Sequence, residues 1–332
     1  MSYNLCNNIL YAVTQIITIF SGKSEIKQSG TGFWVKDNQN NFYLVTNRHV
    51  IDKYHVKDII NPDDYPLTKI QFKIHGSTDL KNQQINETNC KYNSDSDNDI
   101  AVIKFTDFIP PINSFNIRFI PINFFANQAD FCNSIFAGDS IFLVGFPRTW
   151  YDAHNNLPIL RGGFISSSPQ IAKYSDSLKR VKGDCLLIEA TSFGGSSGSP
   201  VITREKGINV GNGLTGGNYF PPKLIGINTG CFYDIINEYC LLYRIKDNNI
   251  RFLINKTNDN KKLEKIIMLK NNEFTREALK YYIKEIELTL TNEEIELILD
   301  ESIKTIKNLN TFHSGLSYIY KSTDILDVIN SF

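Results

Sequence analysis

The sequence predicts a mostly β protein that carries an α-helical extension after residue 256. Up to that point, short segments rich in β-branched and aromatic residues alternate with clusters of Gly, Pro, Asn, Asp and Ser, and helical periodicity is weak. Beyond it, apolar residues recur at the spacing of amphipathic helices. The length of 332 residues suits one domain of about 200–250 residues with a smaller appendage.

Residues 1–256 are expected to form the β domain. Many short strands with turn residues between them are typical of an all-β barrel or sandwich. The segments expected to be strands are residues 17–20, 31–35, 42–46, 70–74, 100–105, 140–146, 185–190, 200–203, 224–229 and 240–245.

Residues 257–332 are expected to form the α-helical extension, after a polar break at residues 255–262. Thr291 and Glu294 have the spacing of a capping box at a helix start, and residues 322–332 suggest a last short helix. We interpret the extension either as a cap packed on the β domain or as a docking element for a partner. Its apolar stripes are Leu279, Tyr282, Ile283 and Ile286, followed by Ile295, Ile298, Leu299, Ile303 and Ile306.

Composition excludes several classes of function. Lys and Arg total 35, as do Asp and Glu, so the formal net charge is zero and neither nucleic acid nor an anionic membrane is an expected partner. Residues 5–20 are apolar but interrupted by polar side chains and lack a basic leader, so neither a secretion signal nor a membrane span is expected. The six cysteines form no C-x-x-C pair, which favours free thiols and a cytoplasmic location.

A candidate general base lies at the end of an apolar strand. His49 follows residues 42–46 in the stretch FYLVTNRHVI, and a base held at a strand end is well placed for catalysis. Taken alone, such a histidine is more often structural. His55, His75 and His313 are expected at the surface, and His154 lies in a polar loop.

A candidate partner for that base lies in NSDSDNDIAVIKF. Asp95, Asp97 and Asp99 resemble the start of a calcium loop, but the EF-hand pattern requires Gly and Glu where Ile100 and Thr106 stand, so no metal site is expected. Asp99 directly precedes a buried strand. There its carboxylate can be partly desolvated and can accept an imidazole N–H.

A candidate nucleophile lies in GGSSGSPV, residues 194–201. A turn of the form G-x-S-G-x-P presents a serine and points backbone N–H groups at a developing oxyanion. In this register Ser197 is the nucleophile, and the oxyanion hole is formed by the turn Gly195, Ser196 and Ser197. A Gly/Ser linker is the alternative, but apolar strands flank the stretch on both sides.

In the order His–Asp–Ser, these segments resemble a trypsin-like serine protease. Within that superfamily the chain is similar to the bacterial HtrA/Deg and glutamyl-endopeptidase branches over residues 10–255. The resemblance implies two six-stranded β-barrels, no cofactor, and the roles of general base for His49, orienting acid for Asp99 and nucleophile for Ser197. The similar pieces are SGTGFWV, YLVTNRHVI, DNDIAVIKF, SIFLVGFPR, ILRGGFISS, GGSSGSPV and LIGINTG.

The resemblance also implies a substrate pocket. Its walls would be Thr191, Ser192, Asn228, Thr229 and Gly230, none of which is charged. Basic specificity would require an acid in place of Thr191, and glutamyl specificity a histidine in place of Asn228. We therefore expect an uncharged side chain before the scissile bond.

The chain departs from its relatives at two points. Ser196 stands where animal digestive proteases carry the Asp that pairs with a freshly cleaved N-terminus, so activation by that ion pair is not expected. No PDZ-like strand pattern follows residue 256, so PDZ-based regulation cannot be carried over from HtrA proteins.

Two hypotheses for function follow. The first is a serine endopeptidase of the bacterial cytoplasm that cleaves protein or peptide substrates through an acyl-enzyme and is regulated in a stress or defence system, with a regulatory protein partner docking through residues 257–332. The second is a latent enzyme or pseudoenzyme, a protease-fold binding module whose helical extension docks a partner.

Overall fold

In the computed structural model, the chain divides into two compact units. One unit comprises Met1–Phe232 and Gly315–Phe332, and the other comprises Tyr233–Ser314. The sheets and the candidate site below belong to the first unit. The residues that the structure describes are 9–56, 59, 61–73, 80–105, 118–147, 151–170, 185–207, 219–234 and 312–332.

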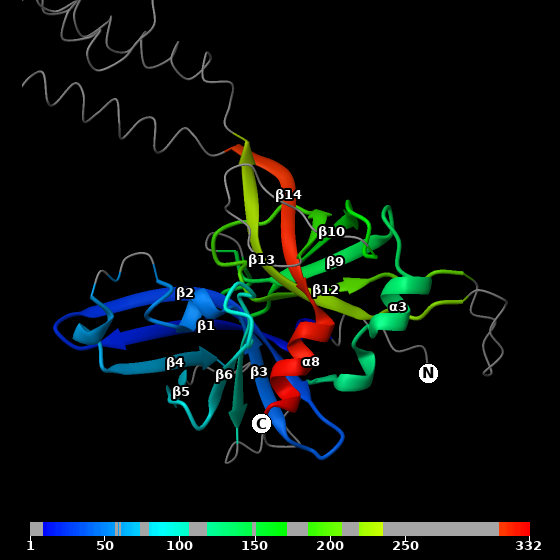
Figure 1. Cartoon of the computed structure of the whole chain (residues 1–332). Helices are drawn as coiled ribbons and strands as arrows, with labels where there is room; N and C mark the ends of the chain where they lie inside the picture. The colour runs from blue at the N-terminus through cyan, green and yellow to red at the C-terminus, as the bar shows by residue number, and fades with distance from the viewer. Residues whose placement is uncertain are drawn as a thin grey trace, which may run out of the picture. The chain divides into compact units, whose positions relative to one another are not determined.

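The first half of the chain forms an eight-stranded sheet (Figure 1, blue to cyan). Its strand order is β5-β4-β1-β2-β3-β7-β6, antiparallel throughout, and β8 pairs in parallel with β2. The strands are β1 (Val13–Ser21), β2 (Glu25–Lys36), β3 (Phe42–Thr46), β4 (Leu67–Lys73), β5 (Leu80–Ile85), β6 (Cys90–Tyr92), β7 (Ala101–Phe105) and β8 (Ile120–Pro121).

The second half forms a closed barrel of order β10-β11-β14-β13-β12-β9. Closure removes the free edges that an open sheet would expose. The last strand of the chain, β14, pairs with both β11 and β13, although it lies far from them in the sequence. Figure 1 shows β14 beside β13. The strands are β9 (Ser140–Gly145), β10 (Ile159–Ile165), β11 (Cys185–Glu189), β12 (Ser199–Thr203), β13 (Leu224–Asp234) and β14 (Phe312–Lys321).

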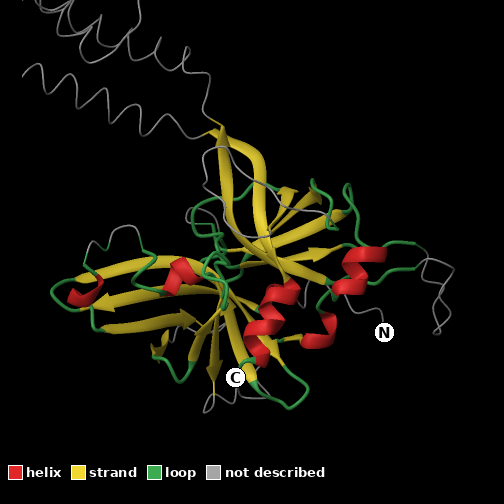
Figure 2. Ribbon diagram, in the orientation of Figure 1, coloured by secondary structure: helices red, strands yellow, loops and turns green. Residues whose placement is uncertain are grey.

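The described helices are short and connect or cover the sheets (Figure 2). α3 begins with a capping box in which Asn127 and Asp130 bond reciprocally to backbone amides. α8 contacts β7 of the first sheet. The helices are α2 (Arg48–Ile51), α3 (Gln128–Asn133) and α8 (Ser322–Asn330), with 3₁₀ turns η1 (Pro62–Asp64) and η2 (Ile122–Phe124). None of the helices in these residues is both long and apolar enough to cross a membrane.

Three of the apolar clusters among the described residues hold the sheets of this unit together. In the first sheet, the ring of Trp34 packs edge-on against Phe72 and Phe105, with centroids 5.2 and 5.1 Å apart. The barrel has its own core, formed by Ile141, Leu143, Ile165, Leu186, Ile188, Val201, Ile225 and Ile319 among others. A third cluster joins the two halves, because side chains of β3 and β7 pack with those of β12, β13 and α8. The candidate site lies where these halves meet.

The mostly β prediction and the last short helix are confirmed, but β14 corrects the predicted extension. The sequence analysis assigned all of residues 257–332 to an α-helical extension, whereas Phe312–Lys321 is a barrel strand. Its period-two pattern buries Ser317 and Ile319 against the barrel, which the preceding helical stripes obscured. The boundary at residue 256, the helical stripes and the expected strand at 240–245 lie outside the described residues.

Candidate active site

His49 and Asp99 are brought together by neighbouring strands. His49 lies in α2, directly after β3, and Asp99 precedes β7, which pairs with β3. The His49 Nδ1 lies 2.5 Å from Asp99 Oδ2, and the His49 backbone N–H donates to Asp99 Oδ1 at 2.8 Å. Because an ionised carboxylate only accepts hydrogen bonds, Nδ1 carries the proton and the Nε2 lone pair is left to act as a base.

The negative charge of Asp99 affects the pKa of Tyr318, a residue of the barrel strand β14. The pKa of Tyr318 is raised above its ordinary value, first by burial and then by the negative charge of Asp99. Both effects favour the neutral phenol of Tyr318.

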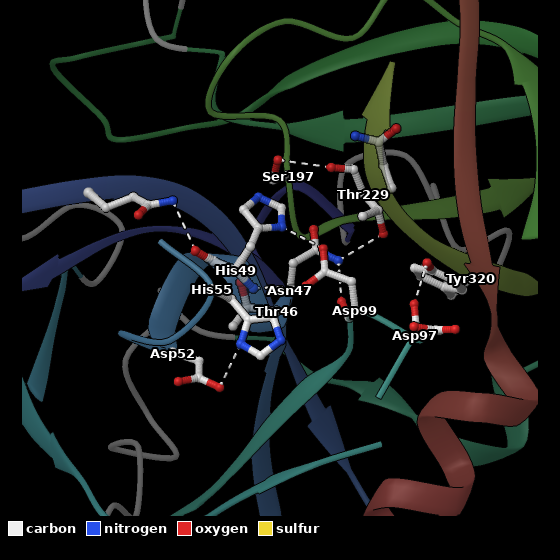
Figure 3. A network of polar contacts seen from close by, with 12 residues as sticks. Thr46, Asn47, His49, Asp52, His55, Asp97, Asp99, Ser197, Thr229 and Tyr320 are labelled. Atoms are coloured by element: carbon white, nitrogen blue, oxygen red, sulfur yellow. Dashed lines mark hydrogen bonds and ion pairs between the residues drawn. The ribbon is translucent and has the colours of Figure 1, made fainter. Parts of the chain in front are cut away.

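The four-residue helix α2 is braced by a buried carboxylate. Asp52 is 5% exposed and accepts from Arg48 Nε at 2.8 Å, while His55 Nδ1 lies 3.0 Å from the same carboxylate (Figure 3). A helix this short is not stable without such contacts. The prediction that His55 lies at the surface is confirmed, and its contact with Asp52 adds to the support of the helix that carries His49.

Ser197 follows a tight turn. The Ser196 amide donates to the Phe193 carbonyl at 2.9 Å, and Gly195 has φ +92°, which together have the features of a type II turn. Gly198 has φ +90°, and a Cβ added there would lie 1.8 Å from the Thr31 carbonyl oxygen. Only glycine fits at that position.

The turn leaves two backbone donors available. Of the amides in the predicted oxyanion hole, that of Ser196 is bonded within the turn, whereas those of Gly195 and Ser197 have no acceptor among the described residues. An unbonded pair of amides separated by one residue is the kind of donor set that binds an oxyanion. Of the three residues predicted for the oxyanion hole, Ser196 is therefore a turn residue, and Gly195 and Ser197 remain the candidate donors.

The hydroxyl of Ser197 donates to the Thr229 carbonyl at 3.1 Å. Figure 3 shows the imidazole ring of His49 between Ser197 and Asp99. No hydrogen bond joins the Ser197 hydroxyl to His49, both of which the structure describes. For His49 to take its proton, the Ser197 side chain must turn from Thr229 toward Nε2.

Two residues that the sequence analysis did not single out connect the halves of the site. The Thr31 hydroxyl donates to the Gly195 carbonyl at 2.7 Å and accepts from the Phe146 amide at 2.9 Å. The Asn47 side-chain amide donates to the Asp99 carbonyl at 2.7 Å and to Thr229 Oγ1 at 2.9 Å. Both lie in the quoted segments SGTGFWV and YLVTNRHVI, which was the available signal.

The predicted pocket residues lie around the turn. Asn228 is buried, and its amide donates to Ser192 Oγ and to the Ser196 carbonyl, each at 3.0 Å. Thr229 holds the Ser197 hydroxyl, as described above. Of the remaining two, Thr191 is exposed, and a Cβ on Gly230 would lie 2.8 Å from the Tyr318 ring.

One charged side chain near this region was missed. Arg161 of β10 donates to the Thr191 carbonyl and, at 2.7 Å, to Ser196 Oγ. It lies in ILRGGFI, where a single arginine within an apolar strand was the only signal.

Comparison with known proteins identifies the family. A model of the trypsin-like peptidase domain matches residues 30–211, more than half of the chain. No curated protein matches this chain. Among solved structures, the crystal structure of Deg5 is similar with a TM-score of 0.39 and 20% identity, over 68% of this chain and 82% of that chain. With the family match over the segments that hold His49, Asp99 and Ser197, the chain belongs to the trypsin-like peptidase family.

Proposed function

We propose that this trypsin-like peptidase is a serine endopeptidase in which His49, Asp99 and Ser197 form the catalytic triad. The observation that carries the proposal is the paired arrangement of His49 and Asp99 beside a serine whose turn offers two unbonded amides. A nucleophile, an oriented base and oxyanion donors are the groups that acyl transfer requires.

The proposed reaction runs through an acyl-enzyme. Ser197 Oγ attacks the scissile carbonyl carbon while its proton passes to His49 Nε2, and the amides of Gly195 and Ser197 bind the oxyanion. His49 then gives that proton to the leaving amine as the C–N bond breaks. Water attacks the acyl carbon, His49 takes its proton, and the Ser197 oxygen leaves and is reprotonated as the carboxylate product departs.

Asp99 serves both protonation states of His49 in this reaction. Its carboxylate keeps the proton on Nδ1 before attack and stabilises the imidazolium that forms during attack. The second bond, from the His49 backbone amide, fixes the carboxylate so that it does not rotate away. The role needs an ionised acid, which an amide cannot replace.

The substrate proposed for the site is a polypeptide with an uncharged side chain before the scissile bond. Ser192, Asn228 and Thr229 contribute hydroxyl and amide groups, and two of those groups already satisfy one another. A substrate carboxylate or ammonium would find no opposite charge among the pocket residues predicted from the sequence.

The regulated, bacterial and cytoplasmic setting is part of the same proposal. The thiols of Cys90 and Cys132 are free, as a reducing compartment favours. The unit Tyr233–Ser314 joins β13 to β14, and β13 carries the Thr229 carbonyl that holds the Ser197 hydroxyl. A protein partner that binds in residues 257–332 could therefore act on the site through β13.

A latent enzyme or pseudoenzyme is the second candidate. The observation that favours it is the hydrogen bond from Ser197 to Thr229, which keeps the hydroxyl from the base. In this case the fold would serve as a binding module until a partner releases the serine.

A panel of peptide p-nitroanilides that differ in the residue before the scissile bond tests the proposal. We expect hydrolysis after uncharged residues, its abolition in Ser197→Ala, and near wild-type rates in Ser199→Ala. Ser199 is a matched control because its buried hydroxyl has no partner among the described residues. Equal rates in wild type and Ser197→Ala would contradict the proposal, and a folded wild type without hydrolysis would favour the latent form.

A further inference from the structure

The guanidinium of Arg161 holds the segment before Ser197 at two points. It donates to the Thr191 carbonyl at the start of the segment and to Ser196 Oγ, at 2.7 Å, at its end. Its Cζ also lies 5.6 Å from the centre of the aromatic ring of Phe193, and Phe193 is the first residue of the turn. We propose that Arg161 is a positioning residue that keeps the oxyanion turn in the form that binds substrate, a role whose catalytic consequence depends on the proposed function.

The placement of Arg161 on a strand makes it a rigid brace. Its backbone pairs with Leu143 of β9, so the side chain projects from the barrel wall rather than from a loop. The segment that it holds, residues 190–198, has only turn and loop structure between β11 and β12. A planar guanidinium with several fixed donors can bind a carbonyl and a hydroxyl at once, which an ammonium group does less well.

The charge of Arg161 is poorly compensated by anything except the turn. No ion pair joins it to a carboxylate of the described residues, and its Nε is buried without a partner there. Burial lowers the pKa of its guanidinium from the ordinary value, although such a group stays protonated. Because it is unfavourable to half-bury a cation that has no carboxylate partner among these residues, an apolar side chain would serve simple packing better.

The contacts explain which part of the turn Arg161 controls. The Phe193 amide donates to Ser196 Oγ at 3.4 Å. The hydroxyl that Arg161 binds therefore also links the first and last residues of the turn. The peptide groups between Phe193 and Ser196 include the Gly195 amide, one of the two proposed oxyanion donors. Fixing Ser196 therefore fixes the direction of that donor.

Three variants separate positioning from simple packing. Arg161→Met keeps the length and removes the donors, Arg161→Lys keeps the charge, and Arg161→Ala leaves space for added methylguanidinium. Arg204→Met is the matched control, because Arg204 is an exposed arginine of the same barrel whose Cζ lies 5.2 Å from the Phe142 ring.

The first readout does not depend on catalysis. Hydrogen–deuterium exchange should quicken at the amides of Ser196, Gly198 and Ser199 in Arg161→Met, because these amides are bonded within or around the turn. Arg204→Met should exchange as wild type does. Unchanged exchange in Arg161→Met would overturn the proposal whether or not the protein is an active protease.

The second readout separates positioning from substrate contact. We expect kcat for an uncharged peptide substrate to fall about 100-fold in Arg161→Met with KM little changed, as misplacement of a catalytic group by about 1 Å predicts. Arg161→Lys should lose less, and methylguanidinium should restore activity to Arg161→Ala. A loss confined to KM for substrates with an acidic residue before the scissile bond would mean that Arg161 binds substrate, which would overturn the positioning role.

Discussion

Replacing Asp99 with asparagine removes one of two contacts that the carboxylate makes to His49. Oδ1 accepts from the His49 backbone amide and Oδ2 from the ring Nδ1. Asparagine has a single oxygen. If that oxygen keeps the backbone bond, the amide NH₂ faces Nδ1, which then must accept, and the ring proton moves to Nε2. His49 could no longer accept the proton of Ser197.

The magnitude follows from the geometry. At the observed N–O distance of 2.5 Å, the centres of charge of an imidazolium and a carboxylate are about 4 Å apart, worth about 4 kcal/mol at an effective dielectric constant of about 20. That dielectric suits these side chains, which are 31% and 18% exposed. At about 1.4 kcal/mol per tenfold change in rate, the lost stabilisation alone slows acylation about 1,000-fold. The wrong tautomer increases this toward about 10,000-fold.

The assay is kcat/KM for Asp99→Asn with the best p-nitroanilide substrate, together with thermal unfolding. Asp97→Asn is the matched control, because Asp97 is an exposed acid two residues away whose contact to Tyr320 is made by its backbone carbonyl. We expect full activity in Asp97→Asn. More than a tenth of wild-type activity in a folded Asp99→Asn protein would refute the role assigned to Asp99.

Three further predictions concern the support of the site and the chemistry of the thiols. Gly198→Ala should prevent folding of the turn, because φ +90° alone costs an L-residue about 1–2 kcal/mol and the added Cβ would overlap the Thr31 carbonyl oxygen at 1.8 Å. We expect a lower Tm and loss of hydrolysis, and wild-type values of both would contradict the prediction. Thr31→Val should lower the free energy of unfolding by about 2–4 kcal/mol, because the lost hydroxyl leaves the Phe146 amide and the Gly195 carbonyl without their partner. Thr31→Ser should recover most of this free energy. Equal midpoints for the wild type and both variants in denaturant titrations would contradict the role of the Thr31 hydroxyl. Cys132 is exposed, whereas burial raises the pKa of the Cys90 thiol to about 12. Iodoacetamide at pH 8 should therefore alkylate Cys132 first. Peptide mapping that finds Cys90 modified first would contradict the burial of Cys90.

Strand-end chemistry made the candidate triad predictable. His49 and Asp99 each adjoin an apolar strand whose ends can be read locally, and the Gly/Ser turn around Ser197 has a pattern of its own. The pairing of β3 with β7 then accounts for the meeting of the first two. The mostly β architecture was predictable for the same reason, because period-two segments bounded by turn residues are a local signal.

Residues that act through long-range contacts were not predictable. Thr31, Asn47 and Arg161 bond to groups of segments far along the chain, and the sequence around each residue does not indicate such a partner. β14 was missed because its short alternating run follows long helical stripes and its partners, β11 and β13, are remote in sequence. Local periodicity cannot indicate which strand closes a barrel.

Labelling with a fluorophosphonate probe, followed by mass spectrometry of the modified peptide, tests the central claim most directly. The probe reacts with a serine only where a base activates it and an oxyanion site receives the developing charge. The account predicts labelling at Ser197 in the wild type and none in Ser197→Ala. Labelling at Ser196 or Ser199, or labelling that persists in Ser197→Ala, would contradict the assignment of Ser197 as the nucleophile.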